Sequence, residues 1–600
     1  MTDLSSSTGL DSSSTGWAND SSSTGAVPDV WSGPIPAGLV PYGAICFIGV
    51  TVFTAMLTWY YARPKLPPMV GVLTFLAWLC AFVICFLVPI DLIPGAGDTL
   101  DTVWSVLFWN SFMLMWFIIP LASGYYDNGC FTFKQKMRSS LRTNGILFLV
   151  AGLIGVIGII YLKAAAGLSW DDVSGLAIAA SNTWGLLILV VMAGYGLVEF
   201  PRTLWNMSHL QRRRDEVCYH ASAVHDEAES TRDELHHTLT FLRLYQTRVD
   251  DTNDETLQMY FRDILNEVRE KEVELNSLRR RAGAYDKEAM QVLEELKKPD
   301  SLVTEENLMK LNYHVKGTVK HLSLVEAQWR DGVREFVDLD AAIGTEGRSG
   351  RPPVGLSCFD SFMWYVRIRF LRRILSVSAI FSAFLTVLLI WMEFFLPFKF
   401  DASPLGAIIK SDAVRNNPLA LQLFSVVPIT YLSICTYFPL FNMRLSKFYY
   451  IGPHRTDEGT LLFNATFMLR AATPLAYNFV LLLKMDATAL LKFIGVINVI
   501  PFFGGSFTQV FPWFIFVIAL MTLLNVWSQL ARLLNMERFQ YVSTSGSELS
   551  SGSEAFQAQR ETIQEGRKLI ELHIRNEQRQ KEQMALNEER LASGTATMLV

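Results

Sequence analysis

The stretch 179–206 reads AASNTWGLLILVVMAGYGLVEFPRTLWN, and it decides the class of the fold. Residues 183–198 carry no charge and are apolar enough to cross a bilayer, which takes about 20 mostly apolar residues in a helix. Glu199, Pro201 and Arg202 then end the apolar run, and the residues that follow are mostly charged and helix-forming. We therefore expect a membrane span that leads directly into a long helical block outside the membrane.

The distribution of charge along the 600 residues predicts a polytopic membrane protein. The hydrophobic share is 50%, and only 18% of the residues are charged. The segments 38–200 and 370–530 are nearly free of charge, whereas 200–366 and 531–600 hold most of it. The net charge of −5 is modest, and no Lys/Arg block is interleaved with aromatic residues, so nothing indicates a nucleic-acid partner.

Hydropathy predicts an all-α fold with nine transmembrane helices, in bundles of five and four. The predicted spans are Gly38–Tyr60, Met69–Ile90, Val103–Leu121, Gly145–Leu162, Leu176–Val198, Ile374–Leu396, Leu419–Phe441, Leu462–Leu483 and Val510–Leu530. One further apolar segment, 490–507, is short for a span and contains Pro501, Gly504 and Gly505. We interpret it as re-entrant or interfacial; a tenth span is the alternative and would place the C-terminus on the other side.

The chain divides by composition into five segments. They are a Ser/Thr/Gly-rich tail (1–36), a five-span bundle (37–199), a helical stalk with its linker (200–366), a four-span bundle (367–530), and a linker with a charged helical tail (531–600). The first segment repeats SSSTG and cannot bury a core, so we expect it to be disordered. Apolar residues recur at helical spacing through the stalk, which predicts two or three antiparallel helices in a coiled-coil-like insert. The charged tail helix is expected to pack on the stalk or to bind a partner.

The basic residues of the short loops predict an orientation. Lys and Arg gather after the first, third, fifth, seventh and ninth spans, whereas the loop 91–102 has three acids and no base. Cytoplasmic loops carry such an excess of Lys and Arg. The N-terminus is therefore expected outside or in a lumen, with the stalk and the C-terminus in the cytosol. Asn19, in Asn-Asp-Ser, is then a candidate glycosylation site. Plasma membrane and endolysosomal membranes are both open as locations.

Polar residues in the spans are candidates for an intramembrane ligand or coupling site. They are Asn182, Tyr195, Glu199, Arg202, Arg470 and Asn478. Arg470 is the sharpest, since it lies about 12–14 Å into its span by helix rise, where a charge is costly and normally faces protein or water. It either anchors a substrate or couples two states, or it pairs internally with Glu199, with tyrosines or with carbonyls. The polar residues of 182–202 either line a cavity between the bundles or only hold helices together, with Pro201 ending the span.

Several other intramembrane residues are interpreted as architecture. Close approach of helices is expected at three glycines: Gly185, Gly194 and Gly196. Pro474 is expected to kink its span. Glu393 and Asp91 lie near the outer ends of their spans, where we expect their carboxylates to reach headgroups or water.

Nothing in the sequence predicts catalysis. The seven cysteines are scattered without a CxxC pair, and the histidines have no HExxH spacing. No GxGxxG, Walker or GxSxG sequence is present. We therefore expect no cofactor, no metal and no enzymatic activity.

Four stretches make the chain resemble the limb-region (LMBR-like) membrane protein family, closest to its branch of limb-region membrane protein domain-containing protein 2. They are NTWGL and GYGLVE-x-PR within 179–205, VPID at 88–91, RLSKFYYIGPHRTDE at 444–458 with Arg470, Pro474 and Asn478 beyond it, and EGRKLI at 565–570. The stalk segment 311–329, which ends in Gln328-Trp329, fits more loosely. The departures are the repeat-bearing N-terminus and the loop 485–509.

The resemblance implies a fold and a range of functions. It implies five spans, a large cytosolic helical insert and four more spans, as the charges also predict. Members are described as lipocalin-type receptors, as trafficking partners in lysosomal cobalamin export and, in this branch, as modulators of G-protein-coupled receptor signalling. We therefore expect a receptor-like or trafficking and signalling adaptor that engages cytosolic or membrane protein partners through its insert and tail. The alternative is a carrier or receptor for a small hydrophobic ligand, held in a cavity between the bundles.

Overall fold

The computed structural model describes ten stretches of the chain: 39–93, 97–166, 172–279, 303–346, 370–398, 402–442, 449–485, 488–495, 513–526 and 554–597. Helices form nearly all of them, and no strand occurs there beyond an isolated bridge between Ala62 and Thr456. The predicted disordered tail, Asn19 and most of the segment 490–507 lie outside the described residues.

The first half of the chain contributes five membrane-length helices. They are α1 (Leu39–Tyr61), α2 (Pro68–Asp91), a composite of α3 (Gly97–Met113), the π-helical turn η1 (Leu114–Ile118) and α4 (Ile119–Tyr126), then α5 (Phe133–Ala166) and α6 (Asp172–Met207). Pro120 explains the π turn, because it has no N–H to donate to the carbonyl of Trp116 four residues earlier. Each of the five predicted spans of this half falls on one of these helices.

The second half contributes three helices of membrane length and several short ones. The long helices are α12 (Leu371–Phe395), α15 (Pro418–Asn442) and α16 (Glu458–Leu482). The short ones are α13 (Pro404–Lys410), α14 (Asp412–Arg415), α17 (Ala489–Gly495) and α19 (Trp513–Leu523). The helix α19 is apolar but short, and the ends of the predicted ninth span lie outside the described residues. The protein is thus an all-α, polytopic integral membrane protein, with eight helices in its described part that are long and apolar enough to span.

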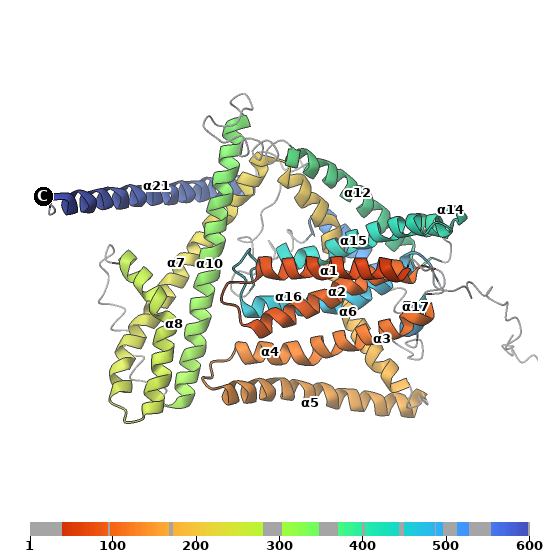
Figure 1. Ribbon diagram of the computed structural model, residues 1–600, viewed down its shortest axis with the longest axis horizontal. Helices are drawn as coiled ribbons and strands as arrows, with labels where there is room; N and C mark the ends of the chain where they lie inside the picture. The colour runs from red at the N-terminus through yellow and green to blue at the C-terminus, as the bar shows by residue number, and fades with distance from the viewer. Residues whose placement is uncertain are drawn as a thin grey trace, which may run out of the picture.

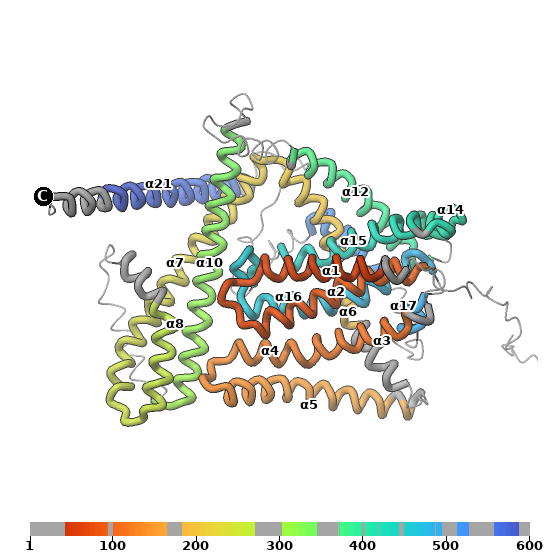
Figure 2. Tube along the Cα trace, viewed as in Figure 1, coloured from red at the N-terminus to blue at the C-terminus, as the bar shows by residue number. Residues whose placement is uncertain are grey.

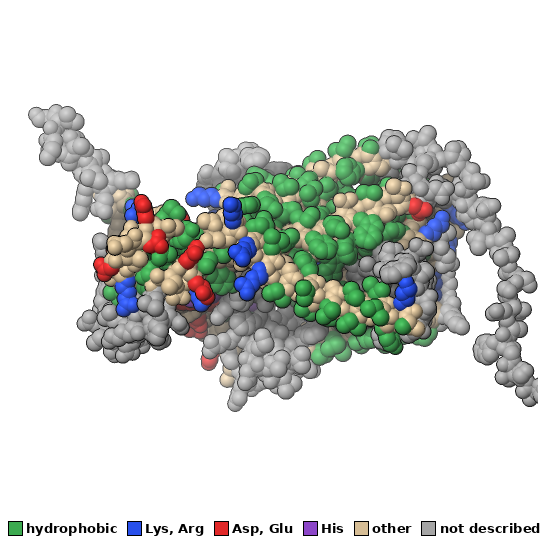
Figure 3. All heavy atoms as spheres, turned by 90° about the horizontal axis from the view of Figure 1, so that it is seen from below, with side chains coloured by type: hydrophobic (Ala, Val, Ile, Leu, Met, Phe, Trp, Pro, Cys, Tyr) green, Lys and Arg blue, Asp and Glu red, His purple; other side chains and the backbone are tan. Residues whose placement is uncertain are grey.

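The two halves share one core. The helix α2 packs on α15 and α16, and α6 lies among α12, α15, α16 and α19. One continuous cluster of buried side chains extends from Val70 of α2 to Ile515 of α19. By contrast, α5 packs on α4 near its N-terminal end, and residues 145–157 are almost entirely exposed. On the face drawn in Figure 3, hydrophobic side chains predominate over the membrane helices, and charged side chains of both signs gather at the end where the insert lies.

The helical insert crosses one end of the membrane helices (Figure 1). Its described helices are α7 (Leu210–Asp250), α8 (Glu255–Arg279) and α10 (Glu305–Glu346), and α7 packs along α10. The residues of the predicted apolar stripes, such as Leu235, Ile264 and Leu322, are buried together between these helices. Thr304 provides the N-cap of α10, accepting from the Asn307 amide at 3.3 Å. The tail helix α21 (Glu554–Thr597) lies against α7 and then extends beyond it (Figure 1).

Candidate functional site

Glycines let α6 touch three neighbouring helices directly. A Cβ atom added to Gly196 would overlap the backbone carbonyl of Cys435 on α15, and one on Gly194 would lie 2.7 Å from the Cβ of Ile518 on α19. A Cβ on Gly185 would lie 2.5 Å from the carbonyl oxygen of Arg470 on α16. The predicted close helix approach at these residues is confirmed, and it makes α6 the helix around which the bundle is packed.

Arg470 lies midway along α16 and points towards aromatic rings. Its guanidinium carbon is 5.2 Å from the ring centre of Trp116 in η1 and 5.7 Å from that of Phe467. Within the described residues its Nε has no hydrogen-bond partner and no carboxylate pairs with it. The suggested pairing with Glu199 is therefore wrong, because Glu199 lies against Arg202 instead. Cation–π contact is the main stabilisation that the structure gives this intramembrane charge.

Each member of this contact lies four residues before a proline. Pro474 has no N–H for the carbonyl of Arg470, and Pro120 has none for the carbonyl of Trp116. The freed carbonyl of Arg470 faces Gly185. Pro474 thus lies one turn beyond the place where α16, α6 and η1 meet, inside the continuous helix α16; the predicted kink there stays a prediction.

The other α6 candidates lie at the end of the span. Arg202 donates to Glu199 Oε2 at 3.0 Å and to Asn525 Oδ1 at 3.1 Å. The helix runs on through Pro201 to Met207, so Pro201 does not end the helical span as expected. Tyr195 is exposed on the bundle surface. Asn182 lies within α6, but its side chain is outside the part that is described. Glu199 and Arg202 thus pair with each other and with Asn525, not with Arg470.

Asn478, near the C-terminal end of α16, belongs to a separate polar pair. Its Nδ2 donates to Glu393 Oε1 of α12 at 2.6 Å, and both residues are 0% exposed. Asp91 is also buried, and it accepts from the backbone amides of Ala489 and Leu490 at 3.0 and 2.9 Å. The expectation that Glu393 and Asp91 reach headgroups or water is wrong, because one is bonded inside the bundle and the other caps α17.

A junction joins α10 to loops of both halves of the chain. Lys320 of α10 lies 2.6 Å from Asp457 Oδ2, at the start of α16, and 3.9 Å from Asp127 Oδ1, after α4. Asp457 also caps α16, accepting from the amides of Gly459 and Thr460. Burial alone would lower the pKa of Lys320, but these carboxylates outweigh burial and raise it. Lys320 therefore fastens the insert to both halves at once.

Further contacts extend this junction along α10. Asp331 accepts from Arg455 Nη1 at 2.8 Å and from the hydroxyl of Tyr450 at 2.9 Å. Asn312 donates to the carbonyl of Gly129 at 2.8 Å. Figure 2 follows α10 past the ends of α4 and α16, where these loops lie. The stretch 444–458, singled out in the sequence, thus fastens the insert to the membrane part through its described residues 449–458.

The tail helix docks on α7 beside the junction. A Cβ on Gly566 would overlap the carbonyl of Cys218, so the two backbones are in contact. Ile570 is fully buried between α7 and α10, and Glu565 accepts from Ser222 Oγ at 3.4 Å. Burial, together with the nearby Asp215, raises the pKa of the Cys218 thiol to about 11. The prediction that the tail packs on the stalk is confirmed for this part of α21.

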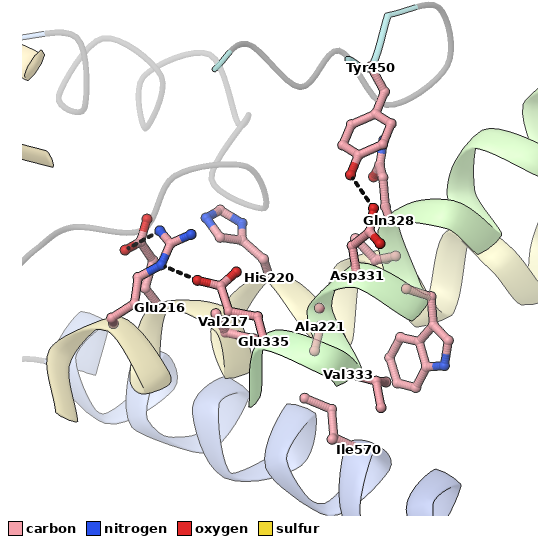
Figure 4. Close-up of a pocket in the computed structure, with 14 residues that line it drawn as sticks. Glu216, Val217, His220, Ala221, Gln328, Asp331, Val333, Glu335, Tyr450 and Ile570 are labelled. Carbon is pink, nitrogen blue, oxygen red and sulfur yellow. Dashed lines mark hydrogen bonds and ion pairs between the residues drawn. The ribbon is translucent and has the colours of Figure 1, made fainter. Parts of the chain in front are cut away.

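A cavity of about 50 Å³ lies where α7, α10, α21 and the loop before α16 meet (Figure 4). Val217, Ala221, Val333, Trp329 and Ile570 form its apolar side. Its polar lining residues are Arg213, Glu216, His220, Gln328, Asp331, Glu335 and Tyr450. Figure 4 shows Tyr450 reaching in from the loop, with its hydroxyl turned to Asp331.

The charges of the cavity wall are paired. Arg213 donates from Nε to Glu335 at 2.6 Å and from Nη1 to Glu216 at 3.1 Å. Burial opposes the charge of Arg213, but the two carboxylates outweigh it, so the pKa of Arg213 is raised. Gln328 differs, since within the described residues its Nε2 has no hydrogen-bond partner although the residue is only 9% exposed. In the sequence, Gln328 stands out only as part of the loosely matching stretch 311–329.

In the described part of the chain, no three His, Cys, Asp or Glu side chains come together as a metal site would require. The described arrangements offer hydrogen bonds, ion pairs and a small cavity, which are the means of binding and of mechanical coupling.

Comparison with known proteins gives a consistent result. The family model for LMBR1-like membrane protein matches residues 42–527. A Dictyostelium discoideum protein named LMBR1 domain-containing protein 2 homolog A is 28% identical over 74% of this chain and 60% of its own length. Proteins named G-protein coupled receptor-associated protein LMBRD2 are 24% identical in Caenorhabditis briggsae, over 79% of this chain and 80% of theirs, and 24% identical in Homo sapiens, over 80% and 69%. No solved structure matches. The resemblance that the sequence motifs suggested is confirmed, and the chain belongs to the LMBR1-like membrane protein family.

Proposed function

We propose that this protein is a receptor-associated adaptor without catalytic activity of its own. Its insert and tail engage cytosolic or membrane protein partners and modulate the signalling or trafficking of G-protein-coupled receptors. Several relatives carry names that describe such receptor-associated proteins. We place the insert and the C-terminus in the cytosol and the N-terminus outside or in a lumen, in the plasma membrane or an endolysosomal membrane, because of the loop charges.

One observation carries this proposal: the insert is fastened to the membrane part at several points. Lys320 and Asp331 of α10 each hold loop residues next to α16, and Gly566 and Ile570 hold α21 against α7. A binding surface carried by such a scaffold keeps a fixed orientation to the membrane. That reduces the ordering cost of binding a partner that is itself in the membrane.

The test uses two matched substitutions in α21. Ile570→Asp places a charge in the buried contact and should undock the tail, whereas Leu572→Asp lies at a half-exposed position and should leave it docked. In cells lacking the protein, Leu572→Asp should restore agonist-stimulated receptor signalling to the level of the unchanged chain. Ile570→Asp and deletion of 554–600 should not restore it. Full restoration by both of those variants, at equal abundance, would rule out the adaptor role of the tail.

A carrier of a small hydrophobic ligand is the second candidate, and Arg470 favours it. An intramembrane cation without a carboxylate partner in the described chain is available to an anionic group of a ligand. If the protein is a carrier, Arg470→Gln should abolish transfer of a fluorescent fatty acid in proteoliposomes, and Arg470→Lys should retain part of it. If it is only an adaptor, Arg470→Gln should support receptor signalling as well as the unchanged chain does.

A further inference from the structure

We infer that the cavity between α7, α10 and α21 receives one uncharged polar side chain, with an acceptor oxygen, from a juxtamembrane segment of a membrane protein partner. The inference rests on the proposed adaptor function and names the site and the chemistry of its partner. The occupant is an Asn, Gln, Ser or Thr side chain that accepts a hydrogen bond from Gln328.

Three stretches that stand out in the sequence meet at this cavity. Gln328 and Trp329 end the stalk stretch 311–329, Tyr450 belongs to 444–458, and Ile570 belongs to 565–570. They come from α10, from the loop before α16 and from α21. No contact of the membrane core explains why all three converge at one small hollow outside it.

The unpaired amide of Gln328 defines what the occupant must offer. Gln328 lines the cavity, and its Nε2 is a buried donor that has no partner among the described residues. A buried donor without an acceptor is unfavourable, so an acceptor oxygen brought by the occupant stabilises the complex.

The charges of the wall decide between charged and neutral occupants. Glu216 and Glu335 are satisfied by Arg213, and Asp331 is satisfied by Arg455 and Tyr450. No carboxylate is left to bind a Lys or Arg, which would also present donors to the donor of Gln328. An Asp or Glu would face three carboxylates against two guanidinium groups. A neutral side chain with an acceptor oxygen avoids both conflicts.

The size of the cavity limits the occupant to one side chain. Pockets for small-molecule ligands usually enclose about 300–1,000 Å³, and this cavity holds about 50 Å³. That is more than the roughly 10–15 Å³ that a cavity needs to hold one water. The apolar side formed by Val217, Ala221 and Ile570 suits a short aliphatic stem.

The position of the cavity indicates a membrane protein as the partner. The membrane helix α6 ends at Met207 and α7 begins at Leu210. His220 of the lining therefore lies about 15 Å along α7 from its first residue, at 1.5 Å per residue. The loop that carries Tyr450 leads directly into the span α16. A partner segment that lies just outside the membrane can therefore reach the cavity without a long linker.

The experiment places a photo-crosslinker in the full chain and co-expresses tagged seven-helix receptors as the probe. Benzoylphenylalanine replaces Gly332, which lines the cavity and whose Cβ would point into open space. A second reporter replaces the exposed Met259 on α8. Two companion variants change Gln328: Gln328→Met removes the donor, and Gln328→Glu replaces the donor with a charged acceptor. Gln578→Glu, at an exposed position of α21, is the control. Thermal unfolding of each purified variant shows that it is folded.

We expect a receptor adduct at Gly332 whose yield falls at least about tenfold with Gln328→Met or Gln328→Glu and is unchanged with Gln578→Glu. The receptor peptide in the adduct should contain an Asn, Gln, Ser or Thr whose Ala variant lowers the yield equally. Replacing that residue by Lys should restore capture by Gln328→Glu.

Other outcomes overturn the inference. An adduct at Gly332 whose yield is the same with every Gln328 variant means that the receptor lies near the cavity without binding Gln328. A charged residue at the mapped contact refutes the chemistry. Adducts at Met259 but none at Gly332 refute this site and leave the adaptor proposal standing, whereas adducts at neither position contradict both.

Discussion

At the scale of residues, single atoms decide how the helices fit. Gly196, Lys320 and Arg470 each touch a group from a helix or loop far away in the sequence. Their chemistry was visible in the sequence, since a glycine permits close approach and an intramembrane arginine requires a partner. Their partners were not, because only the fold brings η1, which carries Trp116, next to α16, which carries Arg470.

Gly196→Ala should destabilise the protein strongly. The added methyl group would overlap the carbonyl of Cys435, and overpacking costs about 1–3 kcal/mol or more where backbone must move. Gly155→Ala on α5, where nothing lies within 4 Å of the added atom, should be tolerated. Thermal unfolding followed by size-exclusion in detergent measures both. Equal midpoints for the two variants would contradict the packing described for α6.

Lys320→Met should loosen the insert from the membrane part. It leaves Asp457 without its ammonium group, and a lost hydrogen bond to a charged group costs about 1.5–3 kcal/mol, less here because Lys320 is partly exposed. Lys310→Met, at an exposed pair with Glu306, should cost under about 0.5 kcal/mol. Thermal unfolding of the purified chains compares them.

The pH dependence of that effect follows from the raised pKa of Lys320. Its contribution to stability is complete below the ordinary value of 10.5 and is lost only as pH rises through the raised folded value. The deficit of Lys320→Met should therefore be the same at about pH 6.5 and about pH 8.5. A deficit that vanishes between these values would show that another group carries it.

At the scale of elements, the helical pattern predicted what each helix buries against its own neighbours. The stripes through Leu235, Ile264 and Leu322 have the helical period, and they meet in one core. The stretches 311–329, 444–458 and 565–570 lie far apart in the sequence, and each stands out there by itself. Their meeting at one cavity depends on α21 crossing α7 at Gly566, and no periodicity in one helix encodes which helix it will cross.

Docking of α21 should control the reactivity of Cys218. The thiol is buried, its pKa is raised to about 11, and Gly566 covers its backbone. At neutral pH we expect very slow maleimide labelling of a chain in which Cys218 is the only remaining cysteine. Ile570→Asp should accelerate labelling at least about tenfold by opening the contact, and Leu572→Asp should leave the rate unchanged. Rapid labelling of the unchanged contact would show that α21 does not dock there.

At the scale of the whole molecule, the membrane helices place the insert and the tail on one side. The helices α7 and α21 touch, so the insert and the tail lie in the same compartment. The loop charges predict that this compartment is the cytosol, and the order of spans predicted from hydropathy agrees with the eight helices described. How the two halves share one core was not predictable, because apolar faces in lipid do not specify which partner they meet.

The proposed topology can be measured by glycosylation. Asn19 should carry an N-linked glycan, seen as a mobility shift that a glycosidase or Asn19→Gln removes. Asn464 also lies in a sequon, but it is buried in α16 between Trp78 and Tyr449 and should stay unmodified. A glycan at Asn206, in the sequon Asn206-Met207-Ser208 just before the insert, would contradict the proposed orientation.

The two contacts of Lys320, with Asp127 and with Asp457, also have a consequence for the synthesis of the protein. Asp127 is already synthesised when Lys320 leaves the ribosome, but Asp457 follows about 140 residues later, which takes roughly 7–28 s at 5–20 residues per second. During that time α10 holds only the first half of the chain, and the sides of α2 and α6 that later meet α15 and α16 are still uncovered. The nascent insert is therefore fixed to one half of the chain before the other half exists. Assembly of this membrane protein can be completed only after the last spans have been synthesised.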